Sequence, residues 1–102
     1  MTPFSKVAID VQVPAIAIPI LQSHYFSVVV IARPGEPDAA WLDRARALGV
    51  NIVVSPDENV LQIAGSFDME FVRIPQGLSQ GPLAKKILDD CVRARNRMRN
   101  AR

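Results

Sequence analysis

The feature that most constrains the fold is a strand-to-helix unit in residues 51–65, NIVVSPDENVLQIAG. Its first five residues form a short β-branched run, which is typical of a buried strand. Ser55 is a suitable helix N-cap, Pro56 fits the first helical position, and Glu58 stands where a capping box places its acid. Gly65 predicts the end of this helix. The unit therefore places Asp57 at the carboxyl end of a strand.

Strand-like and helix-like segments alternate along the rest of the chain. We predict strands at 6–10 (with an extension to 13 as an option), 26–32, 51–55 and 69–74, and helices at 37–48, 56–64 and 82–99. This alternation predicts an α/β fold with three layers, α/β/α, and a mainly parallel four-stranded sheet. The sequence allows two structures for residues 14–25. One is a helix that Pro19 kinks or starts, and the other is a second strand or an irregular turn.

Length and composition indicate one globular domain covering residues 1–102. The chain has 49% hydrophobic and 22% charged residues, which is ordinary for a folded domain. Cys91 is its only cysteine, so a disulfide framework and a cysteine zinc cluster are excluded. The apolar run at 7–21 is interrupted by polar residues and prolines and is shorter than the ~20 residues of a spanning helix. We expect a cytoplasmic protein with no membrane partner.

Charge is divided unevenly along the sequence. Residues 33–78 carry four basic and seven acidic side chains, whereas residues 79–102 carry seven basic and two acidic ones. This division predicts an acidic site and a basic C-terminal helix at 82–99. Arg97, Arg99 and Arg102 have no nearby acid in the sequence and are candidate contacts to RNA phosphates. The alternative is a solubilising end whose cations suit the helix dipole.

Three acids follow three successive predicted strands. Asp10 ends the first strand, and Asp38 and Asp57 open the helices after the second and third strands. Ligands of open parallel sheets bind at the carboxyl ends of the strands, where these acids should meet. At a separation of ~5 Å and an effective dielectric constant near 20, each carboxylate pair repels by about 3 kcal/mol. A divalent cation would relieve this repulsion, and an all-oxygen site favours Mg²⁺ or Mn²⁺.

Structural roles remain open for each candidate residue. Asp38 and Asp57 could simply favour the helix dipole, and Glu58 could serve as a capping partner. We assign His24 a structural role and Cys91 a place in the core. A receiver-like or flavodoxin-like domain is a weaker interpretation, because neither a phosphate-binding glycine loop nor a well-placed lysine accompanies the acids.

The segments KVAID, PDAAWLDRARALG, NIVVSPDENVLQIA and MEFVRIP, in this order, resemble a compact PIN-like domain of the toxin-associated or Mut7-C type over residues 6–76. The resemblance implies a Mg²⁺- or Mn²⁺-dependent ribonuclease in which Asp10, Asp38 and Asp57 hold the metal and Ser55 replaces the hydroxyl residue of the third-strand motif. It also implies RNA as substrate and a toxin role, so an antitoxin and a second copy of the chain are the protein partners considered. Many PIN domains carry a fourth acid, for which this chain offers only Glu58 and Asp68, so a non-catalytic PIN-like binding module is the alternative.

Overall fold

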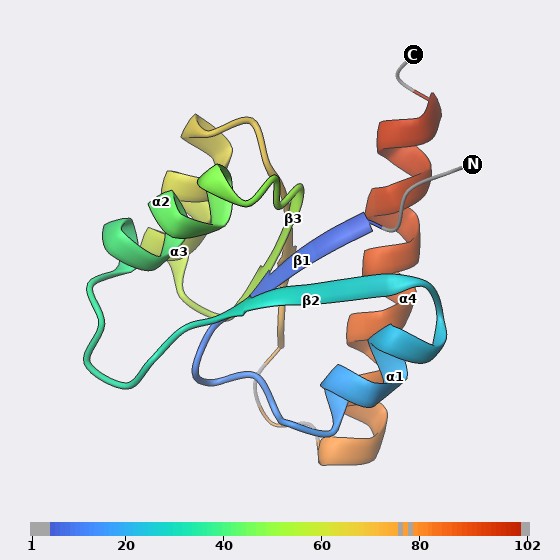
Figure 1. Ribbon diagram of the computed structural model, residues 1–102. Coiled ribbons are helices and arrows are strands. Elements are labelled where there is room, and N and C mark those ends of the chain that lie inside the picture. Colours follow the sequence, from blue (N-terminus) through green and yellow to red (C-terminus); the bar gives the residue numbers. More distant parts are fainter. Residues whose placement is uncertain (1–4, 76, 78, 101–102) are drawn as a thin grey trace.

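The computed structural model describes residues 5–75, 77 and 79–100, with side chains up to Met98. Its strands and helices alternate along the chain (Figure 1). In chain order they are β1 (Ser5–Ile9), α1 (Ala17–Ser23), β2 (Phe26–Ile31), α2 (Asp38–Ala47), β3 (Ile52–Ser55), α3 (Glu58–Ser66), β4 (Glu70–Arg73) and α4 (Gln80–Asn100).

The four strands form one parallel sheet in the order β2-β1-β3-β4. The chain first moves from β1 outward to β2 and then crosses back to pair β3 with the other side of β1. The direction of the connections therefore reverses between β1 and β3, which makes the carboxyl ends of these two strands the switch point of the sheet. The predicted α/β fold with a parallel four-stranded sheet is confirmed.

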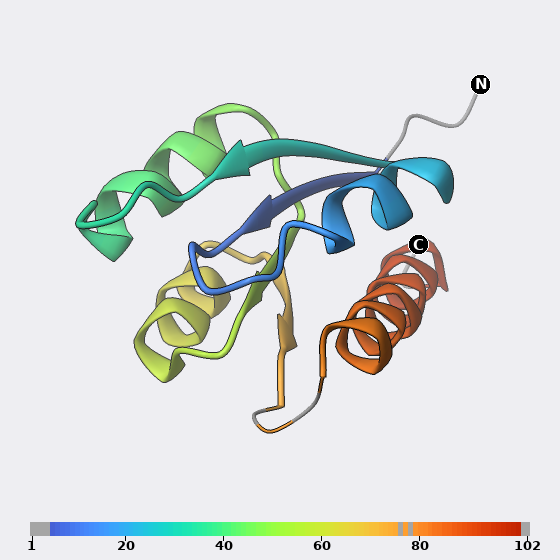
Figure 2. The ribbon, with the colours of Figure 1, turned by 90° about the horizontal axis from the view of Figure 1, so that it is seen from below.

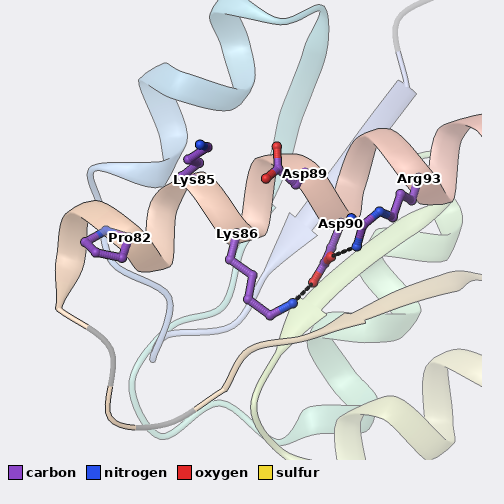
Figure 3. A pocket seen from close by; sticks show the side chains of 6 residues that line it. All are labelled: Pro82, Lys85, Lys86, Asp89, Asp90 and Arg93. Carbon is purple, nitrogen blue, oxygen red and sulfur yellow. Dashed lines mark hydrogen bonds and ion pairs between the residues drawn. The ribbon is translucent and has the colours of Figure 1, made fainter.

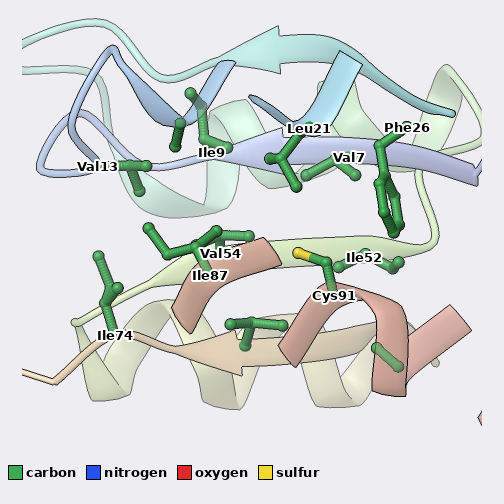
Figure 4. Packing of buried hydrophobic residues seen from close by; sticks show 13 residues of the cluster. Val7, Ile9, Val13, Leu21, Phe26, Ile52, Val54, Ile74, Ile87 and Cys91 are labelled. Carbon is green, nitrogen blue, oxygen red and sulfur yellow. The ribbon is translucent and has the colours of Figure 1, made fainter. Parts of the chain in front are cut away.

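Helices cover both faces of this sheet, with α2 and α3 on one face and α1 and α4 on the other (Figures 1 and 2). Alternate strand residues divide between the two cores, since Val7 and Ile9 face α1 and α4 whereas Ala8 faces α2 and α3. Figure 4 shows the first of these cores, in which Ile87 and Cys91 of α4 pack toward the sheet. The three layers are thus joined by two apolar interfaces.

The segment between β1 and β2, for which the sequence allowed two structures, contains a short helix. Strand β1 ends at Ile9, and the predicted extension to Val13 is wrong because the backbone turns there, with Val13 N donating to Asp10 O at 3.0 Å. Helix α1 then begins at Ala17. Pro19 is its third residue, where a backbone N–H has no partner within the helix, so the proline neither kinks nor breaks it.

The predicted start and end of α3 need correction. Ser55 is not an N-cap but the last residue of β3, and Asp57 caps α3 by accepting a hydrogen bond from Asn59 N at 2.9 Å. Glu58 makes no capping box and instead forms an ion pair with Arg73. The helix also continues past Gly65 to Ser66, and Asp68, with φ of 60°, adopts the left-handed conformation at its end.

Helix α4 begins at Gln80, two residues before the predicted start, because Pro82 in the first turn needs no hydrogen-bond acceptor. Ala84, Ile87, Cys91 and Ala94 share its buried apolar face, as expected for an amphipathic helix. Arg95 also lies on the core, where its guanidinium stacks 4.4 Å from the Phe26 ring centroid and donates to His24 O at 3.0 Å. None of the helices in the described part of the chain is both long enough and apolar enough to span a membrane.

Candidate functional site at the carboxyl edge

Asp10 is a buried acid directly after β1. Asp10 is 5% exposed, and its backbone N–H donates to Val54 O at 3.0 Å, which holds it beside the end of β3. One carboxylate oxygen accepts from Val11 N at 2.6 Å, and the other accepts from the Ser55 hydroxyl at 2.6 Å. The second distance is typical of a charge-assisted hydrogen bond to a carboxylate. Asp10 therefore lies at the switch point with a fixed orientation.

Ser55 connects Asp10 to the next loop. Its side chain is fully buried, and its Oγ accepts from Asp57 N at 3.0 Å while donating to Asp10. Burial of a hydroxyl is tolerated only when its hydrogen bonds are made, and both of these are. Ser55 therefore fixes the orientation of Asp10, whereas its role in a metal site stays a prediction.

Asn59 links the other two acids. Its backbone N–H donates to Asp57 Oδ1 at 2.9 Å, and its side-chain amide donates to Asp38 Oδ2 at 3.1 Å. The remaining Asp38 oxygen accepts from Trp41 Nε1 at 3.2 Å. Asp38, the first residue of α2, and Asp57, at the start of α3, are therefore joined through one amide side chain.

We name these residues the carboxyl-edge cluster: Asp10, Asp38, Ser55, Asp57 and Asn59. Hydrogen bonds run through it from Asp10 to Ser55, from Ser55 to Asp57, and from Asp57 through Asn59 to Asp38. In the described part of the chain, no lysine or arginine forms an ion pair with its three acids. Within residues 5–75, 77 and 79–100, no three histidine, cysteine, aspartate or glutamate side chains are close enough to hold a metal ion as they stand. The metal site remains a prediction.

Asn59 is the member of the cluster that sequence reasoning missed. The pattern Asp57-x-Asn59 carried a local signal, because an N-cap side chain accepts from the backbone N–H two or three residues later. That signal concerns the Asn59 backbone only. The contact between its amide and Asp38, 21 residues away, depends on the packing of α2 against α3.

The predicted RNA-contacting arginines occupy a different part of the molecule. Arg97 forms an ion pair with Glu70 at 2.9 Å, so it has an acidic partner that is distant in sequence. Because Glu70 is the first residue of β4 and all strands are parallel, this pair lies at the amino edge of the sheet, opposite Asp10. The Arg99 side chain and Arg102 lie outside the described residues.

A hollow of about 340 Å³ lies along α4 (Figure 3). Asp90 accepts there from Lys86 at 3.0 Å and from Arg93 at 3.2 Å, so charges of opposite sign neutralise one another. Its lining residues are Pro82, Lys85, Lys86, Asp89, Asp90 and Arg93. None of them belongs to the carboxyl-edge cluster, and the hollow adds nothing to that site.

Cys91 offers no nucleophile. Burial in the apolar core raises the pKa of its thiol to about 12, with a further rise from neighbouring Asp90 and a smaller opposing effect of Arg95. The thiol is therefore neutral at physiological pH, whereas catalytic cysteines react as thiolates. The prediction of a core role for Cys91 is confirmed by its complete burial.

Comparisons of the chain with protein-family models, curated proteins and solved structures find no match.

Proposed function

We propose that this chain is a Mg²⁺- or Mn²⁺-dependent ribonuclease that works at the carboxyl-edge cluster. The observation that carries the proposal is the buried hydrogen bond between Asp10 and Ser55 at the switch point of the sheet. Asp10 caps no helix, because a turn follows it and α1 begins only at Ala17. Dipole stabilisation therefore does not explain this acid, and its place at the carboxyl edge, where open parallel sheets bind ligands, supports the proposal.

The donor atoms of the cluster suit a hard cation. Asp10, Asp38 and Asp57 would hold it through carboxylate oxygens, each of which has lone pairs left after accepting one hydrogen bond. Oxygen ligands of this kind are typical of Mg²⁺ and Mn²⁺ sites. The bound ion would supply an activated water and stabilise charge on the phosphoryl group.

The neighbouring residues have supporting roles in this proposal. The Ser55 hydroxyl fixes the orientation of Asp10. The Asn59 amide lies between α2 and α3 and keeps the Asp38 carboxylate in place. Arg33, exposed just after β2, is the cation that we assign to RNA phosphate binding, because Ala32 N donates to Ile9 O and so holds this segment beside Asp10.

A second candidate function is a non-catalytic PIN-like module that binds a protein or nucleic-acid partner. It is favoured by the observation that Asp57 caps α3 and that both oxygens of Asp38 accept internal hydrogen bonds. A toxin role with an antitoxin partner belongs to the first candidate. Either function fits a reducing compartment such as the cytoplasm, since Cys91 is free.

Thermal melting with and without Mn²⁺ tests the metal site, because a ligand that binds only the folded state raises its stability. We expect Mn²⁺ to raise the melting temperature of the wild type and not that of Asp10→Asn. Asp68, one of the two possible fourth acids, follows the C-terminal end of α3 at the amino edge of the sheet, across from Asp10. Asp68→Asn is therefore the matched control, because Asp68 is exposed and asparagine tolerates its left-handed backbone. An unchanged wild-type melting temperature in saturating Mn²⁺ contradicts the metal site.

Cleavage of a mixed RNA pool then separates the two functions. We expect Mn²⁺-dependent cleavage that falls at least ~100-fold in Asp10→Asn, since one of the three proposed metal ligands would be lost. Asp68→Asn should cleave as the wild type does. Metal binding without cleavage would favour the non-catalytic module.

A further inference from the structure

Trp41 is the one tryptophan of the sequence and lies in α2, three residues after Asp38. It is 1% exposed and belongs to the core between the sheet and helices α2 and α3. Its indole carries one polar group, Nε1–H, and such a group in a core needs an acceptor. The acceptor is Asp38 Oδ1 at 3.2 Å, so a core side chain contacts the carboxyl-edge cluster through its polar atom.

This contact differs from the one that an acid usually makes at the start of a helix. A capping side chain accepts from a backbone N–H two or three residues later. The N-cap of α2 is Pro37, whose side chain has no polar atom. Asp38, the next residue, accepts from the side chains of Trp41 and Asn59. These two side chains therefore set the orientation of the Asp38 carboxylate.

The two donors differ in how firmly they are held. Asn59 is exposed on α3, so water can replace its amide at Asp38 Oδ2. Trp41 is enclosed, and its ring cannot turn away from Asp38 unless the close-packed core opens. The indole N–H therefore fixes the orientation of Asp38, and the Asn59 amide adds a second contact that can exchange with water.

Asp10 has a donor of the same kind. Ser55 is fully buried and donates to one Asp10 oxygen at 2.6 Å. Two of the three acids proposed as metal ligands thus accept from a side chain that is at most 1% exposed. Carboxylates that bind metal ions are themselves held by hydrogen bonds from neighbouring residues, and these bonds orient the ligand.

We propose that Trp41 is a positioning residue of the metal site and acts through Asp38. An indole N–H donates and cannot bind a cation, so Trp41 itself is not a ligand. The hydrogen bond to Asp38 Oδ1 leaves a lone pair on that oxygen for Mg²⁺ or Mn²⁺. This role rests on the proposed metal-dependent function and names the residue that orients one of its ligands.

Isothermal titration calorimetry of the full chain with Mn²⁺ tests this role. Trp41→Phe keeps an aromatic ring in the core and removes the N–H group. We expect it to raise the dissociation constant for Mn²⁺ ~10–100-fold, the usual loss when a hydrogen bond to a metal ligand is removed. Met69→Ala is the matched control, because Met69 is buried in the same core but lies just before β4, at the amino edge of the sheet. It should lower stability and keep the wild-type affinity for Mn²⁺.

The wild type provides a second measurement, because one tryptophan gives one indole N–H resonance in a nitrogen–proton NMR spectrum. We expect Mg²⁺ to shift this resonance until the site is saturated, since the ion changes the charge on the oxygen that accepts from Nε1. Core packing by itself predicts no such shift.

Equal Mn²⁺ affinities of Trp41→Phe and the wild type overturn the role of Trp41 and leave the metal site in place. Equal losses of affinity in Trp41→Phe and Met69→Ala also overturn it, because they would show that only core packing matters. If Trp41→Phe does not fold, the indole resonance decides, and a resonance that stays unmoved while calorimetry shows Mg²⁺ to be bound overturns the role. A wild type that binds neither ion overturns the proposed function as well, so the two failures are distinguishable.

Discussion

The α2–α3 layer and the α1–α4 layer cover the two faces of the same sheet, yet they contribute different chemistry. Helices α2 and α3 begin at the carboxyl edge and place Asp38, Asp57 and Asn59 there. On the other face, α1 carries no charge, and the described ion pairs of α4 join its cations to Asp90 and Glu70. The first layer therefore contributes residues to the candidate site, whereas the second mainly buries apolar surface against the sheet.

The largest expected effect tests the packing role of the α1–α4 layer. The pKa of Cys91 is raised from 9.0 to about 12 in the folded protein, so only the unfolded chain ionises its thiol as the pH passes 9. The contribution of this thiol to the free energy of unfolding is fully present below pH 9. It is lost as the pH rises, by about 1.4 kcal/mol per pH unit, and the total loss is about 4 kcal/mol once the pH exceeds the pKa of the folded state. We expect the difference between the free energies of unfolding of the wild type and Cys91→Ala, both measured in urea, to shrink by about 3 kcal/mol from about pH 8 to about pH 11.

If the difference between the two free energies of unfolding stays constant over that pH range, the raised pKa is contradicted. Alkylation provides an independent measurement, since a buried neutral thiol reacts only after the helix opens. We expect the alkylation rate of Cys91 to follow the unfolding equilibrium.

The next effect tests the hydrogen bonds of the carboxyl edge. Ser55→Ala removes a buried hydroxyl and leaves one Asp10 oxygen and the Asp57 N–H without their partner. We expect a loss of about 1–3 kcal/mol in the free energy of unfolding. Ser66→Ala is the control, because Ser66 is exposed and donates only to Ile63 O at 2.7 Å within its own helix. Equal losses in the two variants would show that Ser55 does not hold Asp10.

A smaller effect measures the link between α2 and α3. The contact of Asn59 with Asp38 is a hydrogen bond to a charged group at 3.1 Å on a partly exposed surface. A double-mutant cycle with Asp38→Ala and Asn59→Ala should give a coupling free energy of about 1 kcal/mol. Additive effects of the two substitutions would mean that the helices are held together by apolar packing alone.

The smallest effect belongs to the amino edge. The Arg97 side chain of the Arg97–Glu70 ion pair is more than half exposed, so Arg97→Ala should lower the free energy of unfolding by at most about 1 kcal/mol. We also expect no change in RNA cleavage, because the pair lies across the sheet from Asp10. Loss of cleavage in Arg97→Ala, with Arg33→Ala still active, would reverse our assignment of the RNA-contacting edge.

Sequence patterns predicted the elements of the fold better than their ends. The β-branched runs were sufficient to locate the strands, and the apolar spacing was sufficient to locate the buried face of α4, because periodic burial is a local property that spacing reveals. The N-cap of α3 is Asp57 and not the predicted Ser55; both residue types make good caps, and only the end of β3 decides between them. Leu48 continues the apolar spacing of Trp41 and Ala45 but is exposed, because it lies past the end of α2.

For the candidate site, the three acids and Ser55 could be named from their places after strands. Their connections could not, because the Asp10–Ser55 contact joins residues 45 positions apart and the Asp38–Asn59 contact joins neighbouring helices. The RNA contacts of the tail arginines stay a prediction, but the fold changes the premise for one of them. Arg97 has no acid nearby in the sequence, yet the fold places Glu70 against it.

Strand and helix preferences act over a few residues, so the amino-acid sequence was sufficient to predict a parallel α/β sheet with carboxylates after three of its strands. Which side chains meet depends on the packing of the folded chain. The strand order placed β3 beside β1, so Ser55 reached Asp10, and it left uncharged β2 at an open edge. Contacts between distant residues depend on how the elements pack, and local preferences carry no record of that packing.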